Sequence, residues 1–266
     1  MNVSERAIRD KLVEQGQILL EAPKEERIKF SGNPDADALL NDLSTHSHAF
    51  VLACLMDRQI RYERAWLIPY EISQRMKGRG LGVFSIENLS TLSQEQVKKL
   101  MSEPEPLHRF LDKMSSVFHS ALQRIANEYA GDASRIWAEE PSSAEVVYRF
   151  LQFDGAGPKI ATLAVNILSR DFKIKFADFY SVDISADVHV CRVFGRLGLC
   201  PSEPTPTQVV YKAKALHPEF PGVMDLPCWE IGKKWCRPRD PQCGKCYMKD
   251  LCPTANGSLP TAFTTR

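Results

Sequence analysis

The sequence predicts an all-α protein. Most segments place apolar side chains three or four residues apart, the spacing at which they share one face of a helix. Two capping boxes, Ser93 with Gln96 and Ser142 with Glu145, indicate helix starts, because the serine accepts from a backbone N–H that the helix leaves unpaired. Only residues 172–182 alternate as a strand would, and a short strand without a partner is interpreted as a loop. We therefore expect helices and no sheet.

Four helices are expected in the N-terminal half. In the first, Ile8, Leu12 and Leu19 share a face, and the second is an apolar run long enough to be a buried helix. The third follows the capping box at Ser93, and the fourth begins where Pro106 suits a first helical turn. These helices cover residues 2–21, 39–56, 94–101 and 107–130.

Four more helices are expected in the C-terminal half. One runs from the second capping box into the turn Gly155-Ala-Gly157, and the next begins at Pro158 directly after that turn. Asp187 has the position of an N-cap for the third, and a proline-rich spacer leads to the last. These helices cover residues 142–153, 158–168, 188–197 and 208–216.

Composition is that of an ordinary globular protein. The chain has 266 residues, 44% of them hydrophobic, enough for a substantial core and most simply divided into two domains. Its net charge of +1 does not by itself indicate a nucleic-acid partner. No apolar run is long enough for a membrane span, and the first residues do not resemble a secretory signal. We expect a cytoplasmic protein, nucleoid-associated if bacterial or archaeal, with no membrane partner.

Four cysteines lie close together near the C-terminus, in the pattern Cys-x6-Cys-x2-Cys-x5-Cys. In a reducing compartment, so dense a group favours one shared metal centre over disulfides. Four thiolates can enclose a zinc ion or a [4Fe-4S] cube. Zinc sites usually pair two short Cys-x2-4-Cys segments and this chain has one, so the spacing favours the iron–sulfur cluster. The expected ligands are Cys236, Cys243, Cys246 and Cys252.

Basic residues are interleaved with these cysteines between residues 233 and 249. A charge run alone is usually a solvated surface. Beside a metal centre, the same charges would gain a fixed geometry that could follow a phosphate backbone. The expected DNA contacts are Lys233, Lys234, Arg237 and Lys245.

The turn Gly155-Ala-Gly157 offers a site for an anion. Both glycines permit backbone conformations closed to other residues, and their N–H groups lie beside the helix start at Pro158. A Gly-x-Gly turn alone is more often a tight interhelical turn. Lys159 strengthens the functional interpretation, because the helix dipole and desolvation there disfavour the ammonium form and so favour a nucleophilic amine. The lysine could also simply contact phosphate.

Asp187 opens the segment Asp187-Val-His-Val-Cys-Arg-Val193. An aspartate before a helix is commonly a structural cap. Opposite a lysine amine in a cleft, it could also take a proton from the nucleophile. Alternatively, it could stabilise the positive charge that develops on a sugar as its base departs.

Three segments together resemble the endonuclease III branch of the helix-hairpin-helix DNA glycosylase superfamily, over residues 41–252. They are Leu151-x-x-x-Gly-x-Gly-Pro-Lys159-x-Ala161, Asp187-x-His189-Val190-x-Arg192-Val193, and the four cysteines, whose spacing equals that of the family's cluster loop. The resemblance implies a six-helix module over 41–177 and a discontinuous helical domain of 1–40 and 178–266 holding a [4Fe-4S] cluster. It implies binding to double-stranded DNA with a damaged or modified base, and we expect a monomer.

The resemblance also assigns roles to single residues. Lys159 matches the lysine that attacks the sugar C1′ and forms a Schiff base, after which β-elimination cuts the strand, and Asp187 matches the aspartate common to the superfamily. The target nucleotide would be flipped out of the stack, at an unstacking cost of a few kcal/mol. Gln59, within Asp57-Arg58-Gln59-Ile60, resembles part of the family's Ser-Gln-Gln-Ile-type segment and is the candidate to fill the gap left by the flipped base.

Two features depart from the family's pattern. The interval from Lys159 to Asp187 is long and contains two competing carboxylates, Asp178 and Asp183. Asp154 begins the hairpin where the family usually has proline, which adds a negative charge near the expected phosphate site. With the unfamiliar stretch 61–82, these departures indicate a divergent subfamily whose target base can differ from the usual oxidised pyrimidine.

Other functions stay open. In a monofunctional glycosylase, water would attack the sugar and Lys159 would only bind phosphate. In a non-catalytic DNA-binding iron–sulfur protein, the hairpin and the cluster loop would serve docking alone, although the presence of both Lys159 and Asp187 favours an enzyme. Neither charge nor motif excludes an RNA partner.

Overall fold

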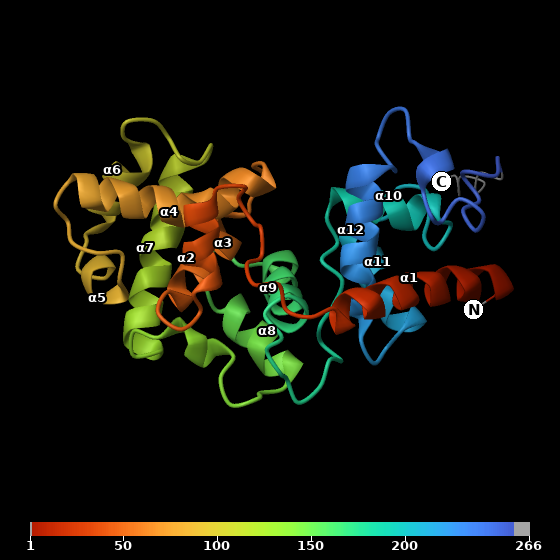
Figure 1. The fold of residues 1–266 in the computed structure, drawn as a ribbon, viewed down its shortest axis with the longest axis horizontal. Coiled ribbons are helices and arrows are strands. Elements are labelled where there is room, and N and C mark those ends of the chain that lie inside the picture. The colour runs from red at the N-terminus through yellow and green to blue at the C-terminus, as the bar shows by residue number, and fades with distance from the viewer. Residues whose placement is uncertain (1, 258–266) are drawn as a thin grey trace. The chain divides into compact units, whose positions relative to one another are not determined.

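The protein is helical throughout the part that the structure, a computed structural model, describes: residues 2–257 contain helices and loops without a strand (Figure 1). The predicted all-α fold is confirmed. The α-helices are α1 (Val3–Glu21), α2 (Pro34–Asn41), α3 (Ser47–Met56), α4 (Tyr62–Gly78), α5 (Ile86–Leu89), α6 (Gln94–Ser102), α7 (Leu111–Glu128), α8 (Ser143–Leu151), α9 (Pro158–Arg170), α10 (Val188–Arg196), α11 (Pro206–Leu216) and α12 (Asp225–Lys234), and the 3-10 helices are η1 (Ala133–Ile136), η2 (Pro221–Met224) and η3 (Cys243–Lys245). No helix among the described residues is long and apolar enough to cross a membrane.

The chain folds into two compact units. The first unit comprises Met1–Lys24, Ser142–Val147 and Val165–Arg266, and the second comprises Glu25–Pro141 and Tyr148–Ala164. Helices α8 and α9 therefore each contribute residues to both units.

Helix α3 forms the centre of the second unit. All ten of its residues are buried, as expected for a helix that is apolar on every side. Helices α4 and α7 pack against it. Beside it, Trp66 of α4 stacks on Phe30 with ring centroids 4.4 Å apart. This packing fixes the C-terminal end of α3, which reaches the candidate site.

The prediction of one helix over 39–56 is wrong, because two helices cover this stretch. Asp42 lies between them and binds the residues that follow it. Its Oδ1 accepts from Ser44 Oγ at 2.7 Å and from the Thr45 N–H at 2.9 Å, and its Oδ2 lies 2.9 Å from Nδ1 of His46. A side chain that binds nearby backbone N–H groups competes with the helix. Apolar periodicity does not reveal that competition.

Helix α7 begins later than predicted, at Leu111. The backbone carbonyls of Pro106 and Leu107 accept instead from the guanidinium of Arg64, at 2.7 and 3.3 Å. A long-range contact thus replaces the first predicted turn.

Helices α4 and α12 lie where no helix was predicted, and each contains a proline. Pro69 lies inside α4 and is buried, whereas Pro227 lies in the first turn of α12. Proline normally indicates the end of a helix, since it lacks the N–H that the ladder requires. Tertiary burial of α4 overrides that local signal.

The other predicted helices are present, with ends close to those expected: α1, α6, α8, α9, α10 and α11. The capping box of α6 is confirmed, because the Gln96 N–H donates to Ser93 Oγ at 3.2 Å and the Ser93 N–H donates to Gln96 Oε1 at 2.8 Å. Residues 172–182 form a loop, as predicted.

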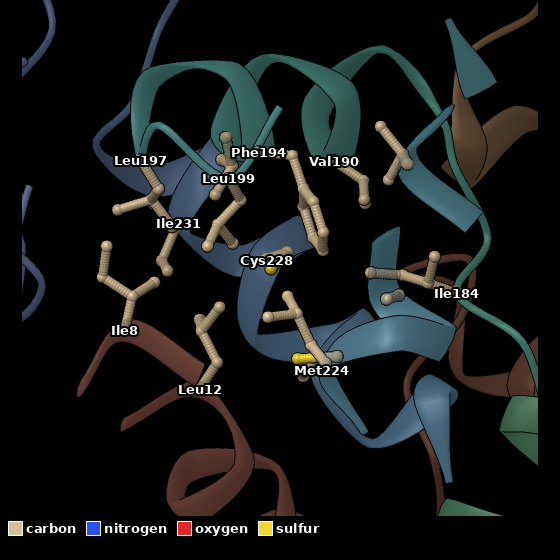
Figure 2. Close-up of a cluster of buried hydrophobic side chains, with 14 of the residues drawn as sticks. Ile8, Leu12, Ile184, Val190, Phe194, Leu197, Leu199, Met224, Cys228 and Ile231 are labelled. Atoms are coloured by element: carbon tan, nitrogen blue, oxygen red, sulfur yellow. The ribbon is translucent and has the colours of Figure 1, made fainter. Parts of the chain in front are cut away.

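The core of the first unit joins the two ends of the chain. Figure 2 shows Ile8 and Leu12 of α1 near Cys228 and Ile231 of α12, with Phe194 of α10 in the same cluster. Helix α1 also passes close to η2, because a Cβ on Gly16 would lie 1.9 Å from the carbonyl oxygen of Val223. Only glycine permits this approach.

Candidate functional site

The hairpin between α8 and α9 depends on Gly155. Its φ of +80° lies in the left-handed region, which favours glycine. A Cβ on Gly155 would also lie 3.0 Å from both methyl groups of Val117 on α7. The hairpin backbone therefore lies directly against α7, and Gly155 is needed for both conformation and space.

Gly157 lies in open surroundings at the start of α9. A Cβ on Gly157 would meet no atom within 4 Å. Its carbonyl accepts from the N–H groups of Ile160 and Ala161, both at 3.0 Å, so Gly157 begins the helix ladder. Among the described residues, the N–H groups of Gly157 and Lys159 donate to no protein acceptor. Unpaired N–H groups at a helix N-terminus suit an anion.

Asp154 binds α7. Its Oδ2 accepts from Ser120 Oγ at 2.6 Å. The negative charge that the sequence places at the start of the hairpin thus has a structural partner, and this bond ties the hairpin to α7.

Lys159 forms an ion pair that the sequence analysis missed. Its Nζ lies 2.7 Å from Oδ2 of Asp57, and the side chains are 39% and 12% exposed, respectively. Lys159 is the second residue of α9, and Asp57 is the C-cap of α3. Both belong to the second unit. The ion pair brings the hairpin lysine beside the segment Asp57-Arg58-Gln59-Ile60.

Gln59 has an unusual backbone within that segment. Its φ of +54° is uncommon for a residue other than glycine, and its side chain is exposed. Nη1 of Arg109 lies 3.5 Å from the Gln59 carbonyl oxygen. The structure therefore brings Gln59 and Lys159 together through Asp57, although Gln59's role at a flipped base stays a prediction.

Asp187 is the N-cap of α10, as predicted. Its Oδ1 accepts from the N–H groups of His189 and Val190, both at 2.8 Å. In the described chain, its Oδ2 receives no hydrogen bond from the protein. Asp187 belongs to the first unit, whereas Lys159 belongs to the second.

The two competing carboxylates both have protein partners. Asp178 accepts from Ser143 Oγ and from the Tyr180 N–H. Asp183 lies 3.1 Å from Nζ of Lys214. Burial raises the pKa of Asp183, and the lysine opposes that rise. In the described chain, the partners of Asp178 and Asp183 likewise contact only Oδ1, so an unbonded Oδ2 does not by itself distinguish Asp187 from these two carboxylates.

The four cysteines of the predicted metal centre line one pocket of the first unit. Apolar side chains such as Val193 and Met248 form part of the pocket wall. In residues 2–257, no group of three or more Cys, His, Asp or Glu side chains is arranged to hold a metal ion. The metal centre therefore stays a prediction.

The chemistry of this pocket fits a group that binds thiolates. Burial raises the pKa of Cys246, a backbone hydrogen bond at Met248 lowers it, and the neighbouring Cys236, Cys252 and Cys243 raise it further. Nη1 of Arg196 donates to Sγ of Cys236 at 3.4 Å. A cation would relieve the repulsion among thiolates.

Arg192 connects α10 to the start of the cysteine loop. Its Nε donates to the Cys236 carbonyl at 2.6 Å, and its Nη2 donates to the Gly232 carbonyl at 2.9 Å and lies 3.0 Å from Nδ1 of His189. A Cβ on Gly232 would lie 2.7 Å from the Cβ of His189, so α10 and α12 are in close contact. His189 and Arg192, which belong to the sequence segment that begins at Asp187, therefore hold the start of the cysteine loop.

The predicted basic contacts are exposed but not equivalent. Lys234 forms an ion pair of 2.7 Å with Glu230, and Nζ of Lys233 lies 4.5 Å from the ring centroid of Trp229. Arg237 and Lys245 lie on the exposed part of the loop. We therefore expect Lys234 to offer less charge to a polyanion than Lys245.

The chain is similar in sequence to endonuclease III proteins. No family model matches the chain. Endonuclease III of Thermotoga maritima is 27% identical over 157 residues, which cover 57% of this chain and 64% of that protein. Endonuclease III homolog 2, chloroplastic, of Arabidopsis thaliana is 28% identical over 188 residues, which cover 68% of this chain and 42% of that protein. The matched part thus spans less than two thirds of either relative.

The fold is also that of solved endonuclease III structures. A trapped endonuclease III–DNA covalent intermediate superimposes with a TM-score of 0.61 at 14% identity, covering 96% of this chain and 99% of that chain. The chain therefore has the helix-hairpin-helix fold of these endonuclease III structures. In sequence and in fold the chain is endonuclease III-like, which confirms the resemblance found in its sequence.

Proposed function

We propose that this protein is a base-excision DNA repair glycosylase with associated lyase activity through Lys159. The observation that carries the proposal is the place of Lys159. Its amine is partly exposed, directly follows the hairpin with unpaired N–H groups, and is held by a largely buried carboxylate. Support comes from the relatives named endonuclease III and from the similar fold trapped covalently on DNA.

The hairpin would bind a phosphate of double-stranded DNA. The open surroundings of Gly157 leave room for a backbone phosphate to approach the N–H groups at the start of α9. Arg237 and Lys245 would add contacts to the backbone, which carry no sequence preference. The partner is therefore duplex DNA with a damaged or modified base, bound by a monomer.

Lys159 would form the covalent bond. A neutral Nζ attacks C1′ of the flipped nucleotide, and the bond between C1′ and the base breaks. The Oδ2 of Asp187, which no protein group binds in the described chain, would stabilise positive charge on the sugar or accept a proton. The C1′–O4′ bond then breaks and O4′ takes a proton, which opens the sugar ring and gives a Schiff base between Nζ and C1′. Loss of a C2′ proton from this Schiff base expels the 3′ phosphate and cuts the strand.

A [4Fe-4S] cluster would be held by Cys236, Cys243, Cys246 and Cys252. The support is a set of four sulfur donors around one pocket and an arginine that donates to one of them. Such a cluster would supply a rigid cross-link for the loop that carries Arg237 and Lys245. We also retain the expected division into a six-helix module over 41–177 and a second domain of 1–40 and 178–266.

Borohydride trapping on lesion-containing duplexes tests the proposal. Wild-type protein should release one or more damaged bases and form a reduced covalent adduct with the same DNA. Lys159→Ala should form no adduct while still binding abasic DNA, because only one charge of the footprint is lost. Base release by the wild type without any adduct would contradict the lyase activity and favour the monofunctional alternative. Binding without base release would favour the non-catalytic alternative.

A further inference from the structure

We propose that Asp57 is the proton acceptor for the Lys159 amine, a role that rests on the proposed covalent chemistry of that lysine. Oδ2 of Asp57 lies 2.7 Å from Nζ of Lys159, the length of a charge-assisted hydrogen bond. A proton can pass directly between atoms at this separation.

The two side chains differ in access to solvent. Asp57 is 12% exposed and follows the fully buried Cys54, whereas Lys159 is 39% exposed. A large substrate can therefore approach the amine from the open side while the carboxylate stays behind it. Asp57 is thus a positioning residue that acts through Lys159 and need not touch the DNA.

Each side chain of the pair lies at a helix end whose partial charge has the same sign as its own. Asp57 is the C-cap of the ten-residue helix α3, where the negative end of the helix dipole disfavours a carboxylate. Lys159 is in the first turn of the thirteen-residue helix α9, where the positive end disfavours an ammonium group. An ion pair placed for stability alone would have its charges at the opposite helix ends.

The step balances without a further reactant. One proton leaves the Nζ ammonium for Oδ2 of Asp57, which gives a neutral amine and a carboxylic acid. The amine lone pair then forms the bond to C1′, while the bond from C1′ to the base breaks and its electron pair leaves with the base. Solvent protonates the released base, and the new secondary ammonium loses its proton to solvent.

The test is the pH dependence of single-turnover borohydride trapping by the full chain on duplex DNA with a preformed abasic site, which removes base recognition from the measurement. Asp57→Asn should trap at least about 100-fold more slowly at pH 7, within the range that general base catalysis contributes. Its rate should rise about tenfold per pH unit, because solvent must then take the proton before attack. The wild type should show a weaker dependence, and Asp57→Glu should restore part of the rate.

Glu5→Gln is the matched control. Glu5 and Lys212 form an ion pair of 2.6 Å with side chains 19% and 26% exposed, similar to the Asp57–Lys159 pair. Glutamine can replace the glutamate in the capping box with Asn2. This variant should keep the wild-type trapping rate and pH profile.

Three outcomes separate the two proposals. If the wild type forms an adduct and Asp57→Asn traps as fast or faster with the wild-type pH profile, the role of Asp57 is overturned and that of Lys159 stands. If Asp57→Asn does not fold, an unchanged rate and pH profile in Asp57→Glu overturns the role, since the longer side chain displaces the acceptor. If the wild type forms no adduct, both proposals fail.

Discussion

Gly155→Ala is the substitution whose cost follows most directly from the structure. Gly155 has a φ of +80°, and a Cβ there would lie 3.0 Å from both methyl groups of Val117. Holding an alanine in the left-handed region costs about 1–2 kcal/mol. Inserting a methyl group into a packed contact costs about 1–3 kcal/mol. We therefore expect the free energy of unfolding to fall by about 2–5 kcal/mol.

Gly157→Ala provides the matched control in the same turn. The backbone of Gly157 is not in the left-handed region, and a Cβ there would meet no atom within 4 Å. At such a position alanine typically stabilises a protein by about 0.4–1 kcal/mol, because it restricts the unfolded chain. The two substitutions should therefore change stability in opposite directions. Gly157→Ala should nevertheless weaken DNA binding, because its methyl group would occupy the expected approach of a phosphate.

Urea denaturation and hydrogen exchange of amides in the second unit measure both effects. Gly155→Ala should also be made in a Val117→Ala background, which removes the two crowded methyl groups. The steric part of the cost should then disappear while the backbone part remains, giving a coupling energy of about 1–3 kcal/mol. Equal losses in both backgrounds would refute the steric argument. A loss below about 0.5 kcal/mol in the wild-type background would refute the backbone argument as well.

Four further predictions concern the rest of the chain. Asp187→Asn should keep the cap of α10 and the melting temperature, yet slow base release in a single-turnover assay by about two to four orders of magnitude; an unchanged rate would exclude a catalytic role. Burial lowers the pKa of His48 to about 4, so the unfolded chain binds the proton first as pH falls. Urea denaturation should show up to about 3 kcal/mol of stability lost between pH 6.5 and 4, and His48→Phe should remove that loss. The purified protein should contain about four iron atoms per chain and Cys246→Ser should lose them, whereas one zinc and no iron would contradict the cluster. Lys245→Gln should reduce the slope of log affinity against log salt by about 0.9, and Lys234→Gln by less, because a glutamate already binds Lys234; equal reductions would contradict this difference.

Helix positions were predictable where the signal is local. The capping box at Ser93 and the cap at Asp187 act within three residues, and the structure has both. The prediction failed where another part of the chain decides. Arg64 binds the carbonyls before α7, and tertiary packing keeps α4 continuous through Pro69. Neither effect leaves a pattern in the residues nearby.

The candidate site was likewise predictable only where its signal is local in the sequence. The hairpin glycines, Lys159 and the cysteine pattern form short motifs, so the sequence alone identified them. Asp57 lies 102 residues from its partner in the chain, and no spacing rule connects them. The partners of the competing carboxylates Asp178 and Asp183 likewise include residues far along the chain, Ser143 of α8 and Lys214 of α11, which no local motif reveals.

A signal for the Asp57–Lys159 pair was nevertheless present in the sequence. The predicted helix over 39–56 ends directly before Asp57, and the predicted helix from Pro158 begins directly before Lys159. Each charge therefore lies at the helix end that disfavours it. A single charge at an unfavourable helix end is common on a protein surface and costs little free energy. When an acid at the C-terminal end of one helix meets a base at the N-terminal end of another, their mutual attraction can offset the cost of both. Because a nucleophilic lysine needs a nearby proton acceptor, a carboxylate at an unfavourable helix end is a reasonable place to search for it. Asp57→Asn should therefore separate stability from activity. Removing the unfavourable carboxylate should change the stability of α3 little, whereas Lys159 should lose its proton acceptor.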